Sequence, residues 1–182
     1  MKLVGNIERE RRFLLRTVSI AQEACLATSI TQGYIFGYEG FACRIRVCRP
    51  LDKGRQDELA YGTFKGPRSG ADRIEEECKL DAGFAWEFLK HIPNKIAKTR
   101  HSVISYGETW EVDQFFGLNE GLWIAECEFE HDAMSLNVPA WCGIEVTNDR
   151  RFDNDVLAFH PLAEWKDEYV REFGPLIVSG DN

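Results

Sequence analysis

Hydrophobic and polar residues alternate with a period of two along most of the chain, as they do in β-strands that bury one face. Eight segments have this pattern, and they predict strands at residues 6–15, 30–37, 42–48, 59–65, 73–78, 96–104, 109–116 and 122–129. Turn-forming stretches separate them, such as GPRSGAD at 66–72 and SYGET at 105–109. The short connections predict hairpins between consecutive strands.

Two further segments have the period of an α-helix. One follows the fifth predicted strand, ends at Pro93, and has apolar residues at spacings of three and four, namely Phe84, Phe88 and Ile92, with Leu89 beside them. The other, at about residues 160–174, has the same spacing at Leu162, Trp165, Tyr169 and Phe173. The charged run NDRRFDND at 148–155 predicts a solvated turn. Because no repeat or linker interrupts the sequence, residues 1–182 are predicted to form a single domain of the α+β class.

The polar face of the predicted strands carries charges in register. In CRIRV, Arg44 and Arg46 share one face of a strand while Ile45 lies on the other. The residues at such positions are Glu8, Glu10, Arg12, Arg44, Arg46, Lys65, Arg73, Glu75, Glu77, Lys98, Arg100, Glu111, Asp113, Glu126 and Glu128. A solvated face of mixed charge explains any one strand. The repetition of paired charges at strand centres favours an eight-stranded antiparallel barrel with a charged lumen, in which the apolar faces point outward beneath helices.

The charged lumen indicates a particular chemistry. Carboxylates that face one another need bound cations, because otherwise they would be protonated or forced apart. Mg²⁺ and Mn²⁺ prefer carboxylate and water oxygens and keep substrate phosphates among their ligands. The arginine and lysine side chains of the same lumen are suited to several phosphate groups. Metal sites next to phosphate sites predict phosphoryl transfer, with hydrolysis of a polyphosphate as the simplest case.

Charge and composition restrict the partners. The chain has 22 basic and 30 acidic residues, a net charge of −8, which disfavours nucleic acid as the main partner. It has no run of 18 apolar residues and no secretory pattern at its N-terminus, so neither a membrane nor export is expected, and a cytoplasmic location is predicted. Its six cysteines form no CxxC pair and no Cys/His spacing, which makes a structural zinc site unexpected.

Residues 7–158 resemble the CYTH superfamily, also called the triphosphate tunnel metalloenzymes. The motifs that carry the resemblance are IERERRFLL, QGY, RIR, TFK, RIEEE, KTRH, WEVDQFFGLNEGLWIAECEFE and PAWCGIEVTNDRRFDNDVLA. The resemblance implies an eight-stranded antiparallel tunnel wrapped by helices. It implies hydrolysis of a triphosphate, with inorganic triphosphate as the first expectation, and it allows a homodimer. Class IV adenylyl cyclase, thiamine triphosphatase and a non-catalytic polyphosphate or nucleotide sensor are the alternatives.

The resemblance also implies roles for the tunnel residues. One divalent ion, Mg²⁺ or Mn²⁺, would be held by Glu8, Glu10 and Glu126. A second ion, which activates the attacking water, would be held by Glu75, Glu77 and Glu128, the last of which is expected to be catalytic. The phosphates would be bound by Arg44, Arg46, Lys65, Lys98 and Arg100, with Lys65 and Lys98 assisting the water or the leaving group.

Five further residues complete the predicted site. Arg73 shares the inward face of its strand and is predicted to bind phosphate. Glu111 and Asp113 match acidic tunnel positions of the family, and Tyr34 of QGY is expected to reach the tunnel. Arg12 stands where the family motif Glu-x-Glu-x-Lys has its lysine, so it keeps the positive charge for a phosphate but not a readily titrated ammonium.

Overall fold

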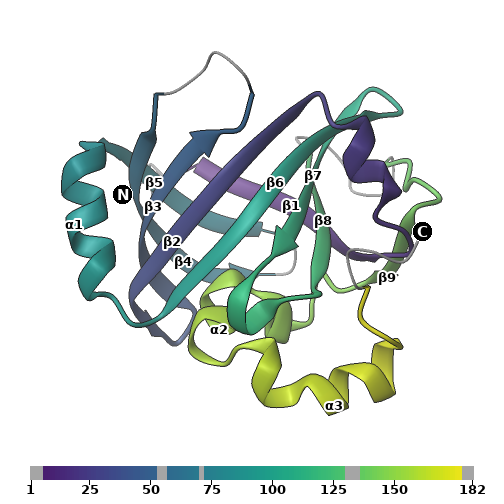
Figure 1. Cartoon of the computed structure of the whole chain (residues 1–182). Helices are drawn as coiled ribbons and strands as arrows, with labels where there is room; N and C mark the ends of the chain where they lie inside the picture. Colours follow the sequence, from purple (N-terminus) through teal and green to yellow (C-terminus); the bar gives the residue numbers. More distant parts are fainter. Residues whose placement is uncertain (1–5, 53–56, 70–71, 130–135, 178–182) are drawn as a thin grey trace.

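The computed structural model describes residues 6–52, 57–69, 72–129 and 136–177, without the side chains of a few of them, among which are Glu8 and Arg73. Within these ranges the chain forms an α+β fold, an antiparallel sheet of nine strands with three α-helices (Figure 1). The strands are β1 (Asn6–Leu15), β2 (Leu26–Tyr38), β3 (Phe41–Pro50), β4 (Leu59–Ser69), β5 (Asp72–Leu80), β6 (Lys95–Ser105), β7 (Glu108–Phe115), β8 (Trp123–Glu128) and β9 (Cys142–Glu145). The helices are α1 (Ala82–His91), α2 (Asn154–Phe159) and α3 (Leu162–Phe173), and the short 3₁₀ turns are η1 (Ser19–Glu23), η2 (Gly117–Asn119) and η4 (Arg150–Phe152).

All eight predicted strands are confirmed, with ends that differ from the predicted ones by up to four residues. The two predicted helices are confirmed as α1 and α3. The prediction of a solvated turn at 148–155 is wrong, because this run contains η4 and α2 begins inside it at Asn154. A six-residue helix has little stability of its own, and α2 is held in place by its fully buried Leu157.

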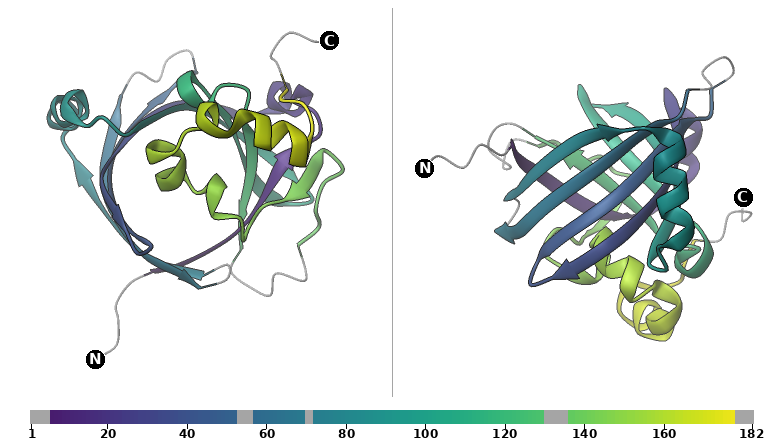
Figure 2. Two further views of the ribbon diagram at one scale, coloured as in Figure 1. Left: turned by 90° about the horizontal axis from the view of Figure 1, so that it is seen from below. Right: turned by 90° about the vertical axis from the view of Figure 1, so that its left-hand side faces the viewer.

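The strands follow one another in the order β5-β4-β3-β2-β6-β7-β8-β1-β9. β1 pairs with β8 through its C-terminal half, and its residues 6–9 pair with β5. The view along the strands in Figure 2 (left) shows β1 to β8 arranged around a common interior. One face of each of these eight strands therefore points into this interior, and the other points outward.

The outer face is covered in two places. α1 packs against β3 and β4 through Ala85 and Leu89, which are buried with Ile45 and Val47 of β3. The apolar outer faces of β1, β7 and β8 form a second cluster, and η1 and the segment before β9 contribute Ile20, Leu136 and Trp141 to it. Among the described helices, none is long and apolar enough to cross a membrane.

α1 buries only part of its predicted apolar stripe. Phe84 and Phe88 belong to that stripe, but they are 48% and 44% exposed and contact each other with ring centroids 4.7 Å apart. A methyl group at Gly33 of β2 would lie only 2.8 Å from Leu89 Cδ2 and 3.0 Å from Ile92 Cγ2. The glycine of QGY thus makes room for the C-terminal end of α1, and this close approach selects Leu89 and Ile92 as the buried residues.

One end of the interior is apolar, and we call it the apolar end. Inward-facing Leu14, Phe115 and Ile124 pack there against Phe152 of η4 and Leu157 of α2. α2 also contacts β2 and β6, and Figure 2 (left) shows it lying across the space that the strands surround. The helix that lies closest to the interior is therefore the one that the sequence pattern did not predict.

Candidate functional site

The rest of the interior is a charged cavity of about 410 Å³. Its lining consists of Glu10, Arg12, Tyr34, Arg44, Arg46, Lys65, Glu75, Glu77, Lys98, Arg100, Glu111, Glu126, Glu128, Asp153, Asn154 and Asp155. The structure thus brings together all the predicted site residues whose side chains it describes, except Asp113, which lies fully buried behind Lys98 and Arg100. Glu8 and Arg73 are Cα partners across β1 and β5, and their side chains lie outside the described part.

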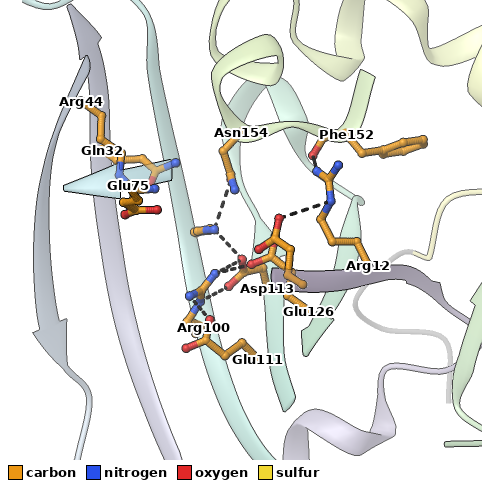
Figure 3. A network of polar contacts seen from close by, with 12 residues as sticks. Arg12, Gln32, Arg44, Glu75, Arg100, Glu111, Asp113, Glu126, Phe152 and Asn154 are labelled. Atoms are coloured by element: carbon orange, nitrogen blue, oxygen red, sulfur yellow. Dashed lines mark hydrogen bonds and ion pairs between the residues drawn. The ribbon is translucent and has the colours of Figure 1, made fainter. Parts of the chain in front are cut away.

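The wall formed by β6, β7 and β8 is a compact ionic network (Figure 3). Asp113 accepts hydrogen bonds from Arg100 Nε and Nη2, both at 2.7 Å, and from Lys98 Nζ. Arg100 Nη2 also donates to Glu126 Oε2 at 2.8 Å, and Arg100 Nη1 donates to Glu111. Burial opposes the ionisation of Asp113, but the charges of Arg100 and Lys98 outweigh it and lower its pKa to about 2. Asp113 is therefore a fixed anion that holds two cations in position.

Glu126 lies where negative charge is in excess. Burial and the nearby charge of Glu10 raise the pKa of Glu126 to about 7, although Arg100 acts in the opposite direction. Both carboxylates are buried, and both line the cavity. Oxygen ligands that repel each other in this way fit a hard divalent cation, which would remove the repulsion.

The opposite wall, from β3, β4 and β5, alternates cations and anions. Arg44 Nη2 lies 3.4 Å from Glu75 Oε1, and Lys65 Nζ lies 2.5 Å from Glu75 Oε2. Arg46 Nη2 donates to Glu77 Oε2 at 2.9 Å. The pair of Arg46 with Glu77 is more open than the pair of Lys98 with Asp113 in the first wall, since the Glu77 side chain is 31% exposed and that of Asp113 is fully buried. The more open pair can therefore exchange partners at a lower cost in free energy.

Tyr34 reaches the cavity, as predicted, although its side chain is almost fully buried. Its hydroxyl accepts a hydrogen bond from Gln32 Nε2 at 3.0 Å. The two neighbouring inward positions of β2 thus support each other, and the tyrosine is the single aromatic residue among the described lining residues.

The cavity has three lining residues that sequence reasoning missed: Asp153, Asn154 and Asp155 of the α2 N-terminus. Asn154 Oδ1 accepts a hydrogen bond from Lys98 Nζ at 3.2 Å. A run of mixed charge without periodicity resembles a solvated turn, so the sequence held no signal that these side chains point inward. The inserted position of α2 is what brings them to the cavity.

Arg12 is buried more deeply than we expect of a side chain that binds phosphate from solvent. Its side chain is 2% exposed and lies beside the apolar end, where it contacts Phe152. Its guanidinium contacts the carbonyls of Phe152 and Thr147 and the carboxylate of Asp153, and Figure 3 shows its contact with Phe152.

The charge balance of the lining is negative. Eight carboxyl groups and six cationic side chains line the cavity in the described part of the chain. Each of these six cations has a carboxylate oxygen within 4.0 Å. The lining can bind a polyanion only if added cations neutralise part of its carboxylates, which makes it a candidate site for divalent ions together with phosphate groups.

Comparisons with known proteins point in the same direction. No protein-family model matches the chain. An inorganic triphosphatase of Acetivibrio thermocellus is 40% identical over 138 residues, which cover 75% of this chain and 83% of the relative. An inorganic triphosphatase of Nitrosomonas europaea is 30% identical over 159 residues, which cover 83% of this chain and 96% of the relative. The crystal structure of the inorganic triphosphatase NE1496 superposes with a TM-score of 0.59 at 28% identity, covering 83% of this chain and 93% of that one.

Proposed function

The chain belongs to the inorganic triphosphatases of the CYTH superfamily, and we propose that it hydrolyses inorganic triphosphate to pyrophosphate and phosphate with the help of divalent cations. The mixed lining of the cavity carries this proposal. Six cationic side chains offer donors to phosphate oxygens, and the carboxylates beside them offer ligands to Mg²⁺ or Mn²⁺. A cavity of about 410 Å³ has room for a chain of three phosphates with its cations.

The strands are proposed to form a closed eight-stranded tunnel. The pairing of β1 with β5 supports closure, because these strands stand at the two ends of the eight-strand order. A closed arrangement leaves no free strand edge between them. With α2 across the apolar end, substrate and water would enter from the opposite end, where Glu77 and Glu111 are partly exposed.

The carboxylates divide into two proposed cation sites. One consists of Glu10 and Glu126, and the resemblance to the family motif adds Glu8 to it. The excess negative charge that raises the pKa of Glu126 supports this site. The other consists of Glu75, Glu77 and Glu128, which line the more open part of the cavity. When bound, the cations would neutralise the triphosphate and activate the attacking water.

The cationic side chains would bind and orient the phosphates. Arg44, Arg46 and Lys65 now contact Glu75 or Glu77, so they can exchange a carboxylate oxygen for a phosphate oxygen when these carboxylates bind a cation. Arg100 is oriented by Asp113 and Glu111 and would donate to a phosphate oxygen from a fixed position. Arg73 is proposed as a further phosphate ligand by its place on β5.

Lys65 and Lys98 are proposed to assist the water or the leaving group, and they differ in environment. Burial lowers the pKa of Lys98, although the charge of Asp113 partly opposes this. A lysine whose ammonium gives up its proton more easily than usual is suited to proton transfer to the leaving pyrophosphate. Lys65 is held by Glu75 in the more open wall and is suited to charge neutralisation.

Phosphate release from inorganic triphosphate by the purified protein, with Mg²⁺ or Mn²⁺, tests the proposal. We expect one phosphate per triphosphate and loss of activity with EDTA. ATP and thiamine triphosphate are assayed in parallel. Formation of cyclic AMP from ATP while inorganic triphosphate stays intact would establish an adenylyl cyclase instead. Preferential turnover of thiamine triphosphate would establish a thiamine triphosphatase. Binding of triphosphate without any release would indicate a sensor and overturn the proposed hydrolysis.

A further inference from the structure

We propose that Arg12 is a positioning residue, which fixes residues 147–155 across the apolar end and thereby sets the position of Asn154 against Lys98. Its effect on turnover rests on the proposed function, but its effect on the position of α2 does not. Arg12 is the residue of the first motif that differs from the lysine of the family pattern.

The contacts of Arg12 carry this inference. Nη1 donates to the carbonyl of Phe152 at 2.8 Å, and Nη2 donates to the carbonyl of Thr147 at 3.0 Å. Nη2 also lies 2.7 Å from Asp153 Oδ1. The main-chain N–H of Arg12 donates to Thr147 Oγ1 at 3.0 Å, and its carbonyl accepts from Val146 N at 2.8 Å. Both terminal nitrogens of the guanidinium are thus engaged with one segment of the chain.

The shape of the guanidinium explains why arginine suits this position. The planar fork of arginine donates to two main-chain carbonyls at once and keeps its charge next to one carboxylate. The ammonium of lysine is a single point at the end of its side chain, so it cannot reach the same three groups. Arg12 is therefore adapted to holding a backbone segment in place.

The segment that Arg12 holds leads directly to the cavity. Asp153 precedes the first residue of α2 and makes no side-chain hydrogen bond to the N-terminus of that helix. The next residue, Asn154, accepts from Lys98 Nζ at 3.2 Å. Because these residues are adjacent, a displacement of Asp153 would move the acceptor away from Lys98. Arg12 is thus connected to Lys98, a proposed phosphate-binding residue, through Asp153 and Asn154.

Steady-state kinetics of the variants R12K and D153A, with inorganic triphosphate as substrate, test the inference. Each variant should lower kcat by roughly 10- to 100-fold and leave KM within about twofold, because misplacement of a reacting group affects the transition state more than binding. The kcat of the double variant should be about as low as that of the slower single variant, since both changes break one link. Arg11→Lys is the matched control, because Arg11 precedes Arg12 on β1 but forms a bidentate pair with Glu145 instead.

A direct phosphate contact by Arg12 predicts the opposite result. In that case R12K keeps a cation, so that mainly KM changes, while D153A removes a competing anion and lowers KM. Such a pattern would overturn the inference. Restoration of kcat in R12K by a second change at Asp153 would also overturn it.

Hydrogen exchange gives a measurement that does not depend on activity. Amides of residues 152–159 should exchange several-fold faster in R12K than in the unchanged protein. The control R11K, whose partner Glu145 accepts from Thr147 at the start of the segment, leaves these amides unaffected. D153A provides the same measurement if R12K does not fold. Unchanged exchange in folded R12K or D153A would overturn the positioning role. If the unchanged protein released no phosphate, the proposed function would fail, and faster exchange in the variants would still support the role of Arg12 in holding α2.

Discussion

The same strands line both the apolar end and the charged cavity, yet the two regions have opposite chemistry. Along β7, inward-facing Glu111 and Asp113 are followed by Phe115, and along β8 inward-facing Ile124 is followed by Glu126. The apolar members of this series are almost fully buried against η4, α2 and α3. Of the charged members, Glu111 and Glu126 line a cavity whose outer part is partly exposed, and Asp113 is buried behind its wall. The position of α2 marks where one chemistry changes to the other.

This difference separates stability from function. Burial of apolar side chains against α2 stabilises the fold, at about 25 cal/mol per Å² of apolar surface. Buried ion pairs repay the cost of desolvation only in part, so the charged cavity is expected to add little net stability. The apolar end should therefore control folding, and the cavity should control turnover.

The largest effect is expected for Glu10→Gln in the cavity. This change removes a proposed cation ligand but keeps the size of the side chain, so phosphate release should fall by at least about 100-fold, more than is usual when an outer-shell partner of a metal is lost. Glu87→Gln on the exposed surface of α1 is the control and should behave like the unchanged protein. Phosphate release by folded E10Q at an unchanged rate would contradict the assignment of Glu10 to a cation site.

The next effect concerns the apolar end. Leu157 is fully buried in the cluster that joins α2 to the strands, so Leu157→Ala should lower the free energy of unfolding by about 2–5 kcal/mol. Chemical denaturation followed by circular dichroism measures it. Val170→Ala on α3, at a position that is 41% exposed, is the control and should change stability by less than about 0.5 kcal/mol. Equal losses in both variants would mean that the burial of Leu157 does not stabilise the fold more than an exposed position does.

Asp113 should make the stability of the cavity wall depend on pH. Its folded-state pKa of about 2 is below the ordinary value of 3.8, so its contribution is present above about pH 4 and is lost as the pH falls towards 2. The difference in free energy of unfolding between the unchanged protein and D113N should shrink by on the order of 2 kcal/mol in this range. Urea denaturation at several pH values measures this difference. A constant difference down to pH 2 would mean that Arg100 and Lys98 do not stabilise the ionised carboxylate.

The smallest effect on stability is expected in the open wall of the cavity. The Glu77 side chain is 31% exposed, and its pair with Arg46 is accessible to solvent. Glu77→Gln should therefore change the free energy of unfolding by less than about 1 kcal/mol while it lowers phosphate release, because the carboxylate is a proposed cation ligand. Thermal unfolding and phosphate release are measured on the same sample. A large loss of stability would show that the open wall supports the fold as the apolar end does.

The sequence predicted the strands and the inward charges for a simple reason. A period of two fixes which residues share a face of a strand, whatever the strand packs against, so Arg44 with Arg46 and Glu75 with Glu77 could be paired from their spacing alone. The packing face of α1 could not be predicted in the same way. Both Phe84 and Leu89 fit a helical stripe, and the choice between them depends on the space that Gly33 leaves on a distant strand.

The sequence alone determined the alternation of the strands, the common face of the charges and the family motifs, because each of these depends on spacing along the chain. The insertion of α2, the inward position of Asp153 and Asn154, and the contacts of Arg12 were decided by the tertiary structure. The acceptors of Arg12 lie about 135 to 140 residues further along the chain, and no local pattern describes a hydrogen bond over that separation. Arg12 could thus be recognised as a cation from the sequence, but which groups it holds became visible only when β1 and η4 were brought together in the fold.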